Sequence, residues 1–232
     1  MQRRGRNYRE AITKVDRTKR YQITEAFELL LSLPKRKFDE SVDIACRLGI
    51  DASKSDQLVR GSVVLPGGTG KSVRVAVFAK GEKQTEAQGA GADTVGGEEL
   101  INKVSGGWME FDRVIATPDM MALVSKLGKV LGPRGLMPNP KMGTVTFDVA
   151  QAVKDQKAGK VEFRADKEGN LHSMLGKISF GKEKLESNFR EFVEAILRVK
   201  PSSVKGVYLR GVTISTTMGP GIKIDTSAVS LG

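Results

Sequence analysis

The sequence predicts a protein of α/β and α+β class with two domains, one inserted into the other. From residue 72 to 159, strand and helix patterns alternate with short links, which is typical of a layered α/β domain with a mainly parallel sheet. The two flanks contain strands with one apolar face and amphipathic helices, and neither flank is large enough to stand alone. Two hinges, a glycine-rich stretch near Pro66 to Gly70 and the single Gly159, separate the three parts. We therefore expect a split α+β outer domain, residues 1–67 and 160–232, and an inserted Rossmann-like α/β domain, residues 68–159.

The first flank contains a short helix and a strand. Residues 24–33 have a helical pattern that Pro34 ends, because proline cannot continue a helix. Residues 41–48 alternate between apolar and other side chains, as a half-buried strand does. The apolar face of this predicted strand consists of Val42, Ile44, Cys46 and Leu48.

The inserted part starts with a strand pattern over residues 72–79, where valines alternate with other residues. Thr117-Pro118-Asp119 predicts a helix start with a hydroxyl cap, a proline in the first turn and an early acid. A last helix, from about Val149, is expected to end at Gly159. The other predicted elements are a helix from Glu82, an extended segment at 92–95, a helix at 98–104 and a strand at 112–116.

The second flank combines an extended pair with a long helix. Residues 160–164 and 171–180 have the pattern of a hairpin with a turn at 166–170. An amphipathic helix follows, and residues 206–224 are again extended. The apolar stripe of this helix comprises Leu185, Phe189, Phe192, Val193 and Ile196.

Charge is distributed unevenly along the chain. The 232 residues include 38 Lys and Arg against 27 Asp and Glu, a formal net charge of +11 with a pI near 9.8. Residues 68–159 contribute only +2, from 12 basic and 10 acidic side chains, whereas the two flanks together contribute +9. A positive field favours a polyanionic partner, although scattered lysines would also suit a soluble surface.

The sequence predicts neither a membrane segment nor a disulfide. No apolar stretch approaches the roughly eighteen residues of a membrane span, and the basic start has no apolar segment behind it, as a secretory signal would. Cys46 is the one cysteine, which excludes an internal disulfide and fits a reducing cytoplasm.

Residues 66–72 read Pro-Gly-Gly-Thr-Gly-Lys-Ser and raise the alternative of a nucleotide-binding loop. Such a loop needs a glycine five residues before Gly70, where this chain has Leu65, and it must open a helix. Here Lys71 leads into a predicted strand instead. We therefore expect a glycine-rich hinge and not an NTPase. Loss of function in a Lys71→Ala variant through lost nucleotide binding would overturn this interpretation.

The chain also lacks the residue groups of other catalytic and metal sites. His172 is the one histidine, Cys46 has no Cys or His near it in sequence, and there is no Gly-x-Ser-x-Gly motif. The first strand of the inserted part is not followed by the glycine fingerprint of a dinucleotide site. We expect no enzymatic activity, no cofactor and no metal.

Two longer stretches are more specific than any of these patterns. Residues 129–145 read Lys-Val-Leu-Gly-Pro-Arg-Gly-Leu-Met-Pro-Asn-Pro-Lys-Met-Gly-Thr-Val, and residues 215–221 read Ser-Thr-Thr-Met-Gly-Pro-Gly. Together with shorter motifs, they resemble the bacterial form of the large-subunit ribosomal protein L-one family, from about Tyr8 to Ile224. The shorter motifs are Lys37-Phe-Asp-Glu40, Asp56-Gln-Leu-Val-Arg-Gly61, Gly81-Glu82, Gly96-Gly-Glu-Glu99 and Gly107-Trp108.

The resemblance implies a split domain that binds ribosomal RNA of the mobile L-one stalk and an inserted domain that extends away from it. It also implies a place on the cytoplasmic ribosome beside the exit site, where deacylated tRNA leaves, and a monomer off the ribosome. Many bacterial members bind a mimic of the rRNA site on their own messenger RNA and repress its translation. The expected partners are therefore large-subunit rRNA, exit-site tRNA and the chain's own mRNA.

The resemblance places the RNA-binding residues in the two flanks. Structured RNA is recognised by its shape, phosphates and 2′-hydroxyls, which hydroxyl side chains, close backbone and apolar groups can contact. We expect Lys37 to contact phosphate, and Thr217 to donate and accept hydrogen bonds. The full predicted set is Lys37, Phe38, Arg164, Lys167, His172, Ser215, Thr217, Met218 and Gly219.

Several of these residues have ordinary structural alternatives. Phe38 would equally suit a core, His172 a satisfied structural position, and residues 215–221 a strand that ends in a turn. At Gly211 relatives often have a polar or charged residue, which weakens the expectation of a supporting contact there.

Two further segments keep two interpretations each. The loop from Arg134 to Lys141 would be a tight structural loop or a secondary contact to RNA or tRNA. The basic start, with eight Lys or Arg against two acids through Arg20, would be a phosphate-binding arm or a solubilising tail. The hinges at Gly67, Gly68 and Gly70 and at Gly159 would let the inserted domain swing while the split domain holds RNA.

Overall fold

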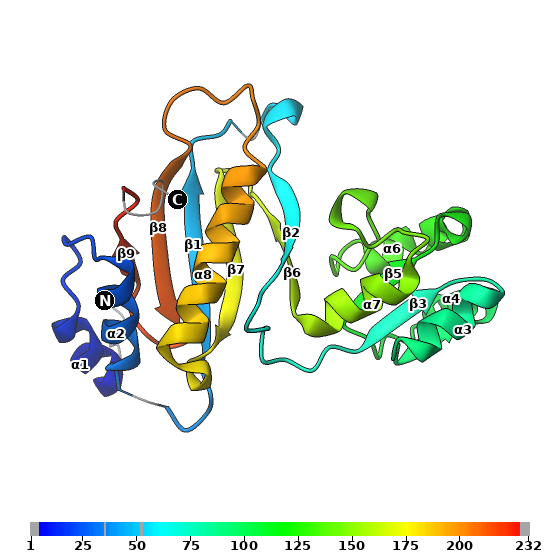
Figure 1. Ribbon diagram of the computed structural model, residues 1–232, viewed down its shortest axis with the longest axis horizontal. Helices are drawn as coiled ribbons and strands as arrows, with labels where there is room; N and C mark the ends of the chain where they lie inside the picture. The colour runs from blue at the N-terminus through cyan, green and yellow to red at the C-terminus, as the bar shows by residue number, and fades with distance from the viewer. Residues whose placement is uncertain (1–4, 35, 52, 228–232) are drawn as a thin grey trace. The chain divides into compact units, whose positions relative to one another are not determined.

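The structure of the chain is a computed structural model that describes residues 5–34, 36–51 and 53–227. The chain divides into two compact units, unit 1 (Met1–Gly70 with Val161–Gly232) and unit 2 (Lys71–Lys160). Figure 1 shows that both ends of the chain, coloured blue and orange to red, build unit 1, and that the green middle builds unit 2. None of the helices in the described ranges is long and apolar enough to cross a membrane.

Unit 1 is centred on a four-stranded antiparallel sheet with the order β7-β1-β8-β9. Its strands are β1 (Ser41–Leu48), β7 (Asn170–Lys177), β8 (Leu209–Thr216) and β9 (Ile222–Ile224). β1 comes from the first flank and pairs on both sides with strands from the second. The alternation predicted for β1 is confirmed, because its four apolar residues are all buried.

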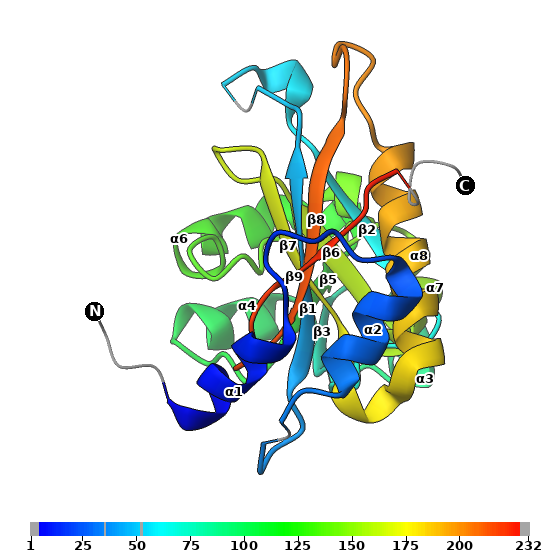
Figure 2. The ribbon, with the colours of Figure 1, turned by 90° about the vertical axis from the view of Figure 1, so that its left-hand side faces the viewer.

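Two helices cover one face of this sheet, α2 (Ile23–Leu31) and α8 (Gly181–Arg198). Figure 2 shows both on the same side of the strands. The stripe predicted for α8 is buried, and Phe189 packs edge-on against Phe27 of α2 with ring centroids 5.8 Å apart. At the surface, Lys182 Nζ lies 2.6 Å from Glu28 Oε1. Buried rings, each removing about 150–250 Å² from water, contribute much of the stability of such a core.

The hairpin predicted for residues 160–180 is wrong in its pairing. β6 (Lys160–Arg164) pairs with β2 (Arg60–Val64) in a separate two-stranded sheet, whereas β7 pairs with β1. Just beyond β6, Ala165 forms an isolated antiparallel bridge with Leu171 of β7. Long-range packing decides the partner: Phe163 of β6 lies on Phe192 of α8, with ring centroids 5.6 Å apart.

The basic start packs on unit 1 in its described part. α1 (Arg6–Lys14) buries Ala11, and Val15 follows it into the same core. Tyr21 then forms a parallel bridge with Ile224 of β9. This segment is therefore not a loose tail, and residues 1–4 lie outside the described residues. Two short 3-10 helices complete unit 1, η1 (Ser55–Gln57) and η5 (Ile178–Phe180).

Unit 2 contains a parallel sheet with the order β4-β3-β5. Alternate residues of the central strand enter two buried clusters, Phe78 one cluster and Val77 the other. Because apolar clusters cover both faces of β3, all four of its residues are buried. The strand spans Val75–Phe78 and is shorter than the predicted 72–79. The elements are β3 (Val75–Phe78), α3 (Glu82–Gly89), β4 (Thr94–Gly96), α4 (Glu98–Ser105), β5 (Arg113–Ala116) and α7 (Val149–Ala158).

The helix predicted after Thr117 is a series of short helices. The predicted hydroxyl cap is wrong, because Thr117 is buried and its hydroxyl lies 3.5 Å from the carbonyl of Phe78. The helix α7 does end as predicted, at Gly159 with a left-handed φ of 103°. The helices of this series are η2 (Pro118–Met120), α5 (Met121–Val124), η3 (Ser125–Leu127) and α6 (Gly128–Leu131). A separate 3-10 helix, η4 (Pro140–Met142), follows later in the chain.

One buried side chain of α8 holds the glycine-rich stretch between β2 and β3. Asn188 Oδ1 accepts a hydrogen bond from the Gly67 amide at 2.8 Å. Its Nδ2 donates to the carbonyls of Gly68 and Leu175, at 3.0 and 2.7 Å. A Cβ built on Gly67 would lie 3.0 Å from Asn188 Oδ1, so glycine permits this approach. Gly67 and Gly68 are thereby fixed to unit 1.

A second set of hydrogen bonds, which we also call a clamp, holds the other end of the segment that runs from β2 to β3. We call this segment the crossing. The carboxylate of Asp112 accepts hydrogen bonds from the amide and the Nε of Arg74, at 3.1 and 3.2 Å. These bonds from Arg74 lower the pKa of Asp112. Residues 71–74 have no helical turn and lead into β3. The chain between the two clamps therefore consists of residues 69–73.

We expect Asn188→Ala to lower the free energy of unfolding of unit 1 by about 2–4 kcal/mol, because the buried polar groups of Gly67, Gly68 and Leu175 lose their partner. Urea unfolding followed by hydrogen exchange of the β1 amides reports unit 1 separately. Ser187→Ala, at an exposed neighbouring position of α8, is the control and should change stability by less than about 0.5 kcal/mol. Equal effects of the two substitutions would contradict the assigned clamp.

Candidate nucleic-acid interface

The predicted residues Thr217, Met218 and Gly219 form the turn between β8 and β9, beside the start of β1. The Thr217 amide donates to the Ser41 carbonyl at 3.1 Å, and the Ser41 amide donates to the Thr217 hydroxyl at 3.1 Å. The Thr217 hydroxyl also lies 3.4 Å from that carbonyl as a donor. The bonds of this hydroxyl within the described chain therefore extend the β1–β8 pairing and position the turn.

A buried carboxylate that the sequence reasoning missed lies under the same turn. Glu40 is 3% exposed, and its Oε1 accepts a hydrogen bond from the Met218 amide at 2.9 Å. Its main-chain carbonyl accepts another from Ile178. Burying a carboxylate is unfavourable unless hydrogen bonds compensate. Glu40 thus draws the Met218 amide inward, while the Met218 side chain stays 52% exposed. The available signal was the Lys37-Phe-Asp-Glu40 motif, of which Glu40 is the last residue.

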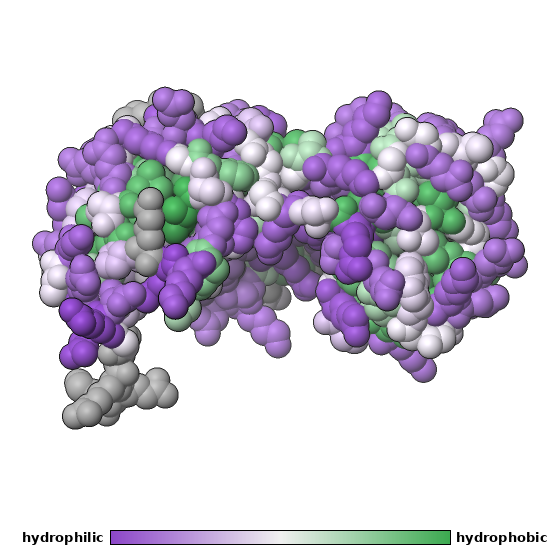
Figure 3. Space-filling model, turned by 90° about the horizontal axis from the view of Figure 1, so that it is seen from below, coloured by the Kyte–Doolittle hydropathy of each residue, from purple (hydrophilic) through white to green (hydrophobic). Residues whose placement is uncertain are grey.

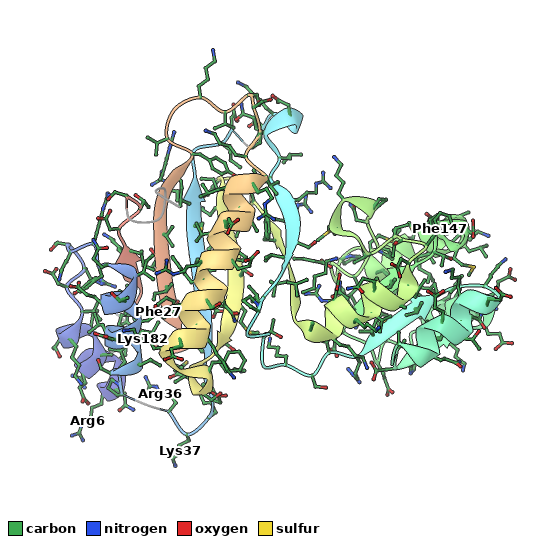
Figure 4. The ribbon with its side chains drawn as sticks, viewed as in Figure 1. Arg6, Phe27, Arg36, Lys37, Phe147 and Lys182 are labelled. Carbon is green, nitrogen blue, oxygen red and sulfur yellow. The ribbon has the colours of Figure 1, made fainter. Side chains whose placement is uncertain are left out.

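Lys37 and Phe38 lie in the segment that leads to Glu40 and β1. Figure 4 shows Lys37 pointing away from unit 1. Phe38 is 54% exposed, so its alternative as a core residue is wrong. Asp39 ties the segment to η5 by accepting hydrogen bonds from the amide and hydroxyl of Ser179, at 3.2 and 2.7 Å. Two exposed apolar side chains, Phe38 and Met218, therefore stand on neighbouring, well-anchored segments.

We call the group Lys37, Phe38, Thr217, Met218 and Gly219 the turn end of unit 1. Figure 3 views the molecule from below and shows apolar areas on unit 1 among hydrophilic residues. Gly219 serves the packing of the turn, since a Cβ there would collide with the hydroxyl of the buried Thr216. The glycine is thus required by the turn itself.

The face of the sheet opposite α2 and α8, which we call the outer face, carries two more predicted residues. Ser215 lies opposite Asp43 of β1, and His172 lies opposite Ala45. Successive residues on one face of a strand are about 7 Å apart. His172 is exposed and therefore shares a face with Ser215, one row further from the turn.

The structure does not bring Arg164 and Lys167 to the turn end. Arg164 ends β6 in the other sheet of unit 1, and Lys167 lies in the connection before β7. That connection adjoins the end of β7 that pairs with Arg47. Arg47 is roughly 20 Å along β1 from Ser41, at about 3.4 Å per residue. The predicted set is therefore divided between two ends of the sheet.

The thiol of Cys46, in β1, is buried. Burial raises the pKa of the Cys46 thiol to about 12, which leaves very little thiolate for nucleophilic attack near neutral pH. Within the described ranges, no group of three or more His, Cys, Asp or Glu side chains could hold a metal ion. Hydrogen bonds, apolar contacts and positive charge are what the surface offers.

Comparison with known proteins identifies the family. The model of the Ribosomal protein L1p/L10e family matches residues 30–220. The chain is also similar to the large ribosomal subunit protein uL1 of Solidesulfovibrio magneticus, with 58% identity over 229 residues that cover 99% of this chain and 97% of that protein. The chain belongs to the ribosomal protein L1 family. The resemblance inferred from the sequence motifs is confirmed.

Membership of the L1 family makes the chain a protein of the large ribosomal subunit, associated with the ribosome and structural, not enzymatic, in its role. The family match includes every predicted site residue and Glu40. The mixed α/β content that the sequence predicted agrees with this membership.

We expect Glu40→Ala to release the Met218 amide, because the substitution removes its hydrogen-bond acceptor. Exchange of this amide with solvent should become about tenfold faster or more, which corresponds to a loss of about 1.4 kcal/mol of protection. The Ile178 amide is the internal control, since it bonds the main chain of residue 40 and should keep its protection. Unchanged exchange at Met218, or equal acceleration at both amides, would refute this role of Glu40.

Proposed function

We propose that the chain binds ribosomal RNA of the mobile stalk of the large subunit through the turn end and outer face of unit 1, and that it assists release of exit-site tRNA. The observation that carries this proposal is the exposure of Phe38 and Met218 on segments whose main chain is bonded internally. Exposed apolar groups on anchored segments suit contact with ribose and base faces. Family membership supports rRNA as the partner.

The charge of the chain supports the same partner. Unit 1 carries 25 Lys and Arg against 17 Asp and Glu, so it contributes +8 of the +11 net charge. Cations that neutralise phosphates release condensed counterions, so binding should weaken as salt rises.

We expect Phe38→Ala to weaken binding of a short rRNA stalk fragment by about 5- to 150-fold, since a stacked ring contributes about 1–3 kcal/mol. Phe147→Ala is the matched control, because Phe147 is similarly exposed, at 58%, but belongs to unit 2. Affinities are measured for the fragment and for an unrelated hairpin of equal length, at two salt concentrations.

Two outcomes of this measurement would count against the proposal. If Phe38→Ala binds as tightly as the wild type, the turn end is not the contact surface. If the wild type does not discriminate the stalk fragment from the hairpin, the basic flanks are a nonspecific polyanion surface and the proposed function fails.

Repression of the chain's own mRNA is a second function that the same surface would perform. Recognition by shape does not depend on which molecule carries the shape. We propose that the 5′ region of the messenger competes with the rRNA fragment for a monomer of the chain. Phe38→Ala should weaken the binding of both RNAs by the same factor.

We propose that unit 1 holds RNA while unit 2 reorients by rotation at residues 69–73 and near Gly159. Gly70 and Gly159 have φ angles of 70° and 103°. Fluorophores on Ser187→Cys in unit 1 and Ser105→Cys in unit 2, with the native Cys46 buried, should report several distances in the free chain by single-molecule energy transfer. RNA binding should shift their populations. One fixed distance, with and without RNA, would contradict the motion.

A further inference from the structure

A hollow lies on the outer face, beyond the row of Ser215. Its volume is about 450 Å³, and the segments around it come from β1, β7, β8, β9 and the chain before Tyr21. The floor is low because β1 and β8 have small residues there, Ala45 and Gly211. A side chain built on Gly211 would meet open space. The pairing of Ala45 with Thr213 and of Arg47 with Gly211 makes these adjacent rows of one surface.

Positive charge surrounds this hollow. Four cationic side chains line it: Arg20, Arg47, Arg210 and Lys223. All four are exposed, and no Asp or Glu is among the described residues that line the hollow. Thr213 and Thr226 also line the hollow and carry hydroxyl groups, whereas the Thr18 hydroxyl donates to Asp16 Oδ1 at 2.6 Å. Like charges around one hollow repel each other, and an anion bound among them relieves that repulsion.

The four cations differ in their surroundings. Hydrogen bonds from Ser227 and, in smaller measure, the charge of Arg20 lower the pKa of Asp225, so Arg20 has a carboxylate nearby. Arg47, Arg210 and Lys223 form no ion pair with any described residue. These three side chains are the ones whose charge is available to a partner.

We propose that the hollow binds backbone phosphates of the same RNA that the turn end recognises, and that it does so without reading bases. This inference rests on the proposed RNA-binding function. The hollow begins at the row of Ala45, about 14 Å along β1 from Ser41. Double-stranded DNA carries about one phosphate per 1.7 Å of its axis, and duplex RNA likewise has one phosphate per nucleotide on each strand. An RNA docked on the turn end and lying along the outer face therefore brings several phosphates to the hollow. Phosphate contacts position an RNA, and the turn end supplies discrimination.

The test removes the three charges and compares salt dependence. The hollow variant is Arg47→Gln with Arg210→Gln and Lys223→Gln. The control variant is Arg190→Gln with Arg198→Gln and Lys184→Gln, three exposed positions on α8, which covers the opposite face of the sheet. Both variants lose two arginines and one lysine, so their net charges are equal. Affinity is measured for the stalk fragment and the unrelated hairpin between 50 and 200 mM salt.

We expect the slope of log affinity against log salt to fall by about 3 in the hollow variant and by less than 1 in the control. Over a fourfold change in salt, the wild type should then lose about 40-fold more affinity than the hollow variant. The ratio of affinities for the two RNAs should stay that of the wild type.

Each contrary outcome has a separate meaning. Equal slopes in the hollow and control variants overturn the phosphate site while leaving the proposed function intact. If the hollow variant no longer discriminates the stalk fragment from the hairpin, the wild-type hollow reads bases, which also overturns the inference. A wild type that never discriminates refutes the proposed function itself. Saturable binding of inorganic phosphate at constant ionic strength, lost in the hollow variant, would assign the hollow to a free anion instead of RNA.

Discussion

Unit 1 depends on the pairing of one strand, β1, with strands from the far end of the chain. β7 and β8 bind both edges of β1, and all of unit 2 lies between β1 and β7 in sequence. The entropy lost on closing a loop grows only slowly with its length, and an inserted unit that folds by itself shortens the loop further. The insertion is therefore tolerated, but the core of unit 1 cannot form until the last part of the chain is present.

The same pairing determines both faces of the sheet at once. A slip of one residue would bring Val42 and Ile44 to the outer face and bury Asp43, so the buried side fixes the register. The hydrogen bonds between Ser41 and Thr217, and the bond that the Met218 amide donates to Glu40, exist only in this register. The outer face and the turn end thus derive their geometry from the core beneath them.

Sequence periodicity predicted the strands and helices that bury one apolar face, and motif resemblance predicted the family. The apolar positions that periodicity predicts for β1 and α8 are all buried. Prediction failed where a distant partner decides: β6 and β7 look like a hairpin locally, but Phe163 packs on Phe192 and β7 completes the sheet of β1. In the candidate site, Glu40 was missed because a carboxylate before a strand suggests solvent, and the Met218 amide that binds it comes near only in the folded chain.

Glycine content predicts a flexible stretch at residues 66–70. Glycine can give a chain conformational freedom, but it can also let the backbone approach a side chain closely and be held there. Gly67 allows the backbone to approach Asn188, and Gly68 takes a φ of 71° that its hydrogen bond to Asn188 helps to maintain. Glycine adopts this conformation easily, but here the conformation is fixed, because the buried Asn188 bonds both the Gly67 amide and the Gly68 carbonyl. With Asp112 holding Arg74 at the other end, a short segment has to absorb any rotation at this crossing. A short linker between two clamps restricts the directions in which unit 2 can turn more than a long glycine-rich one would.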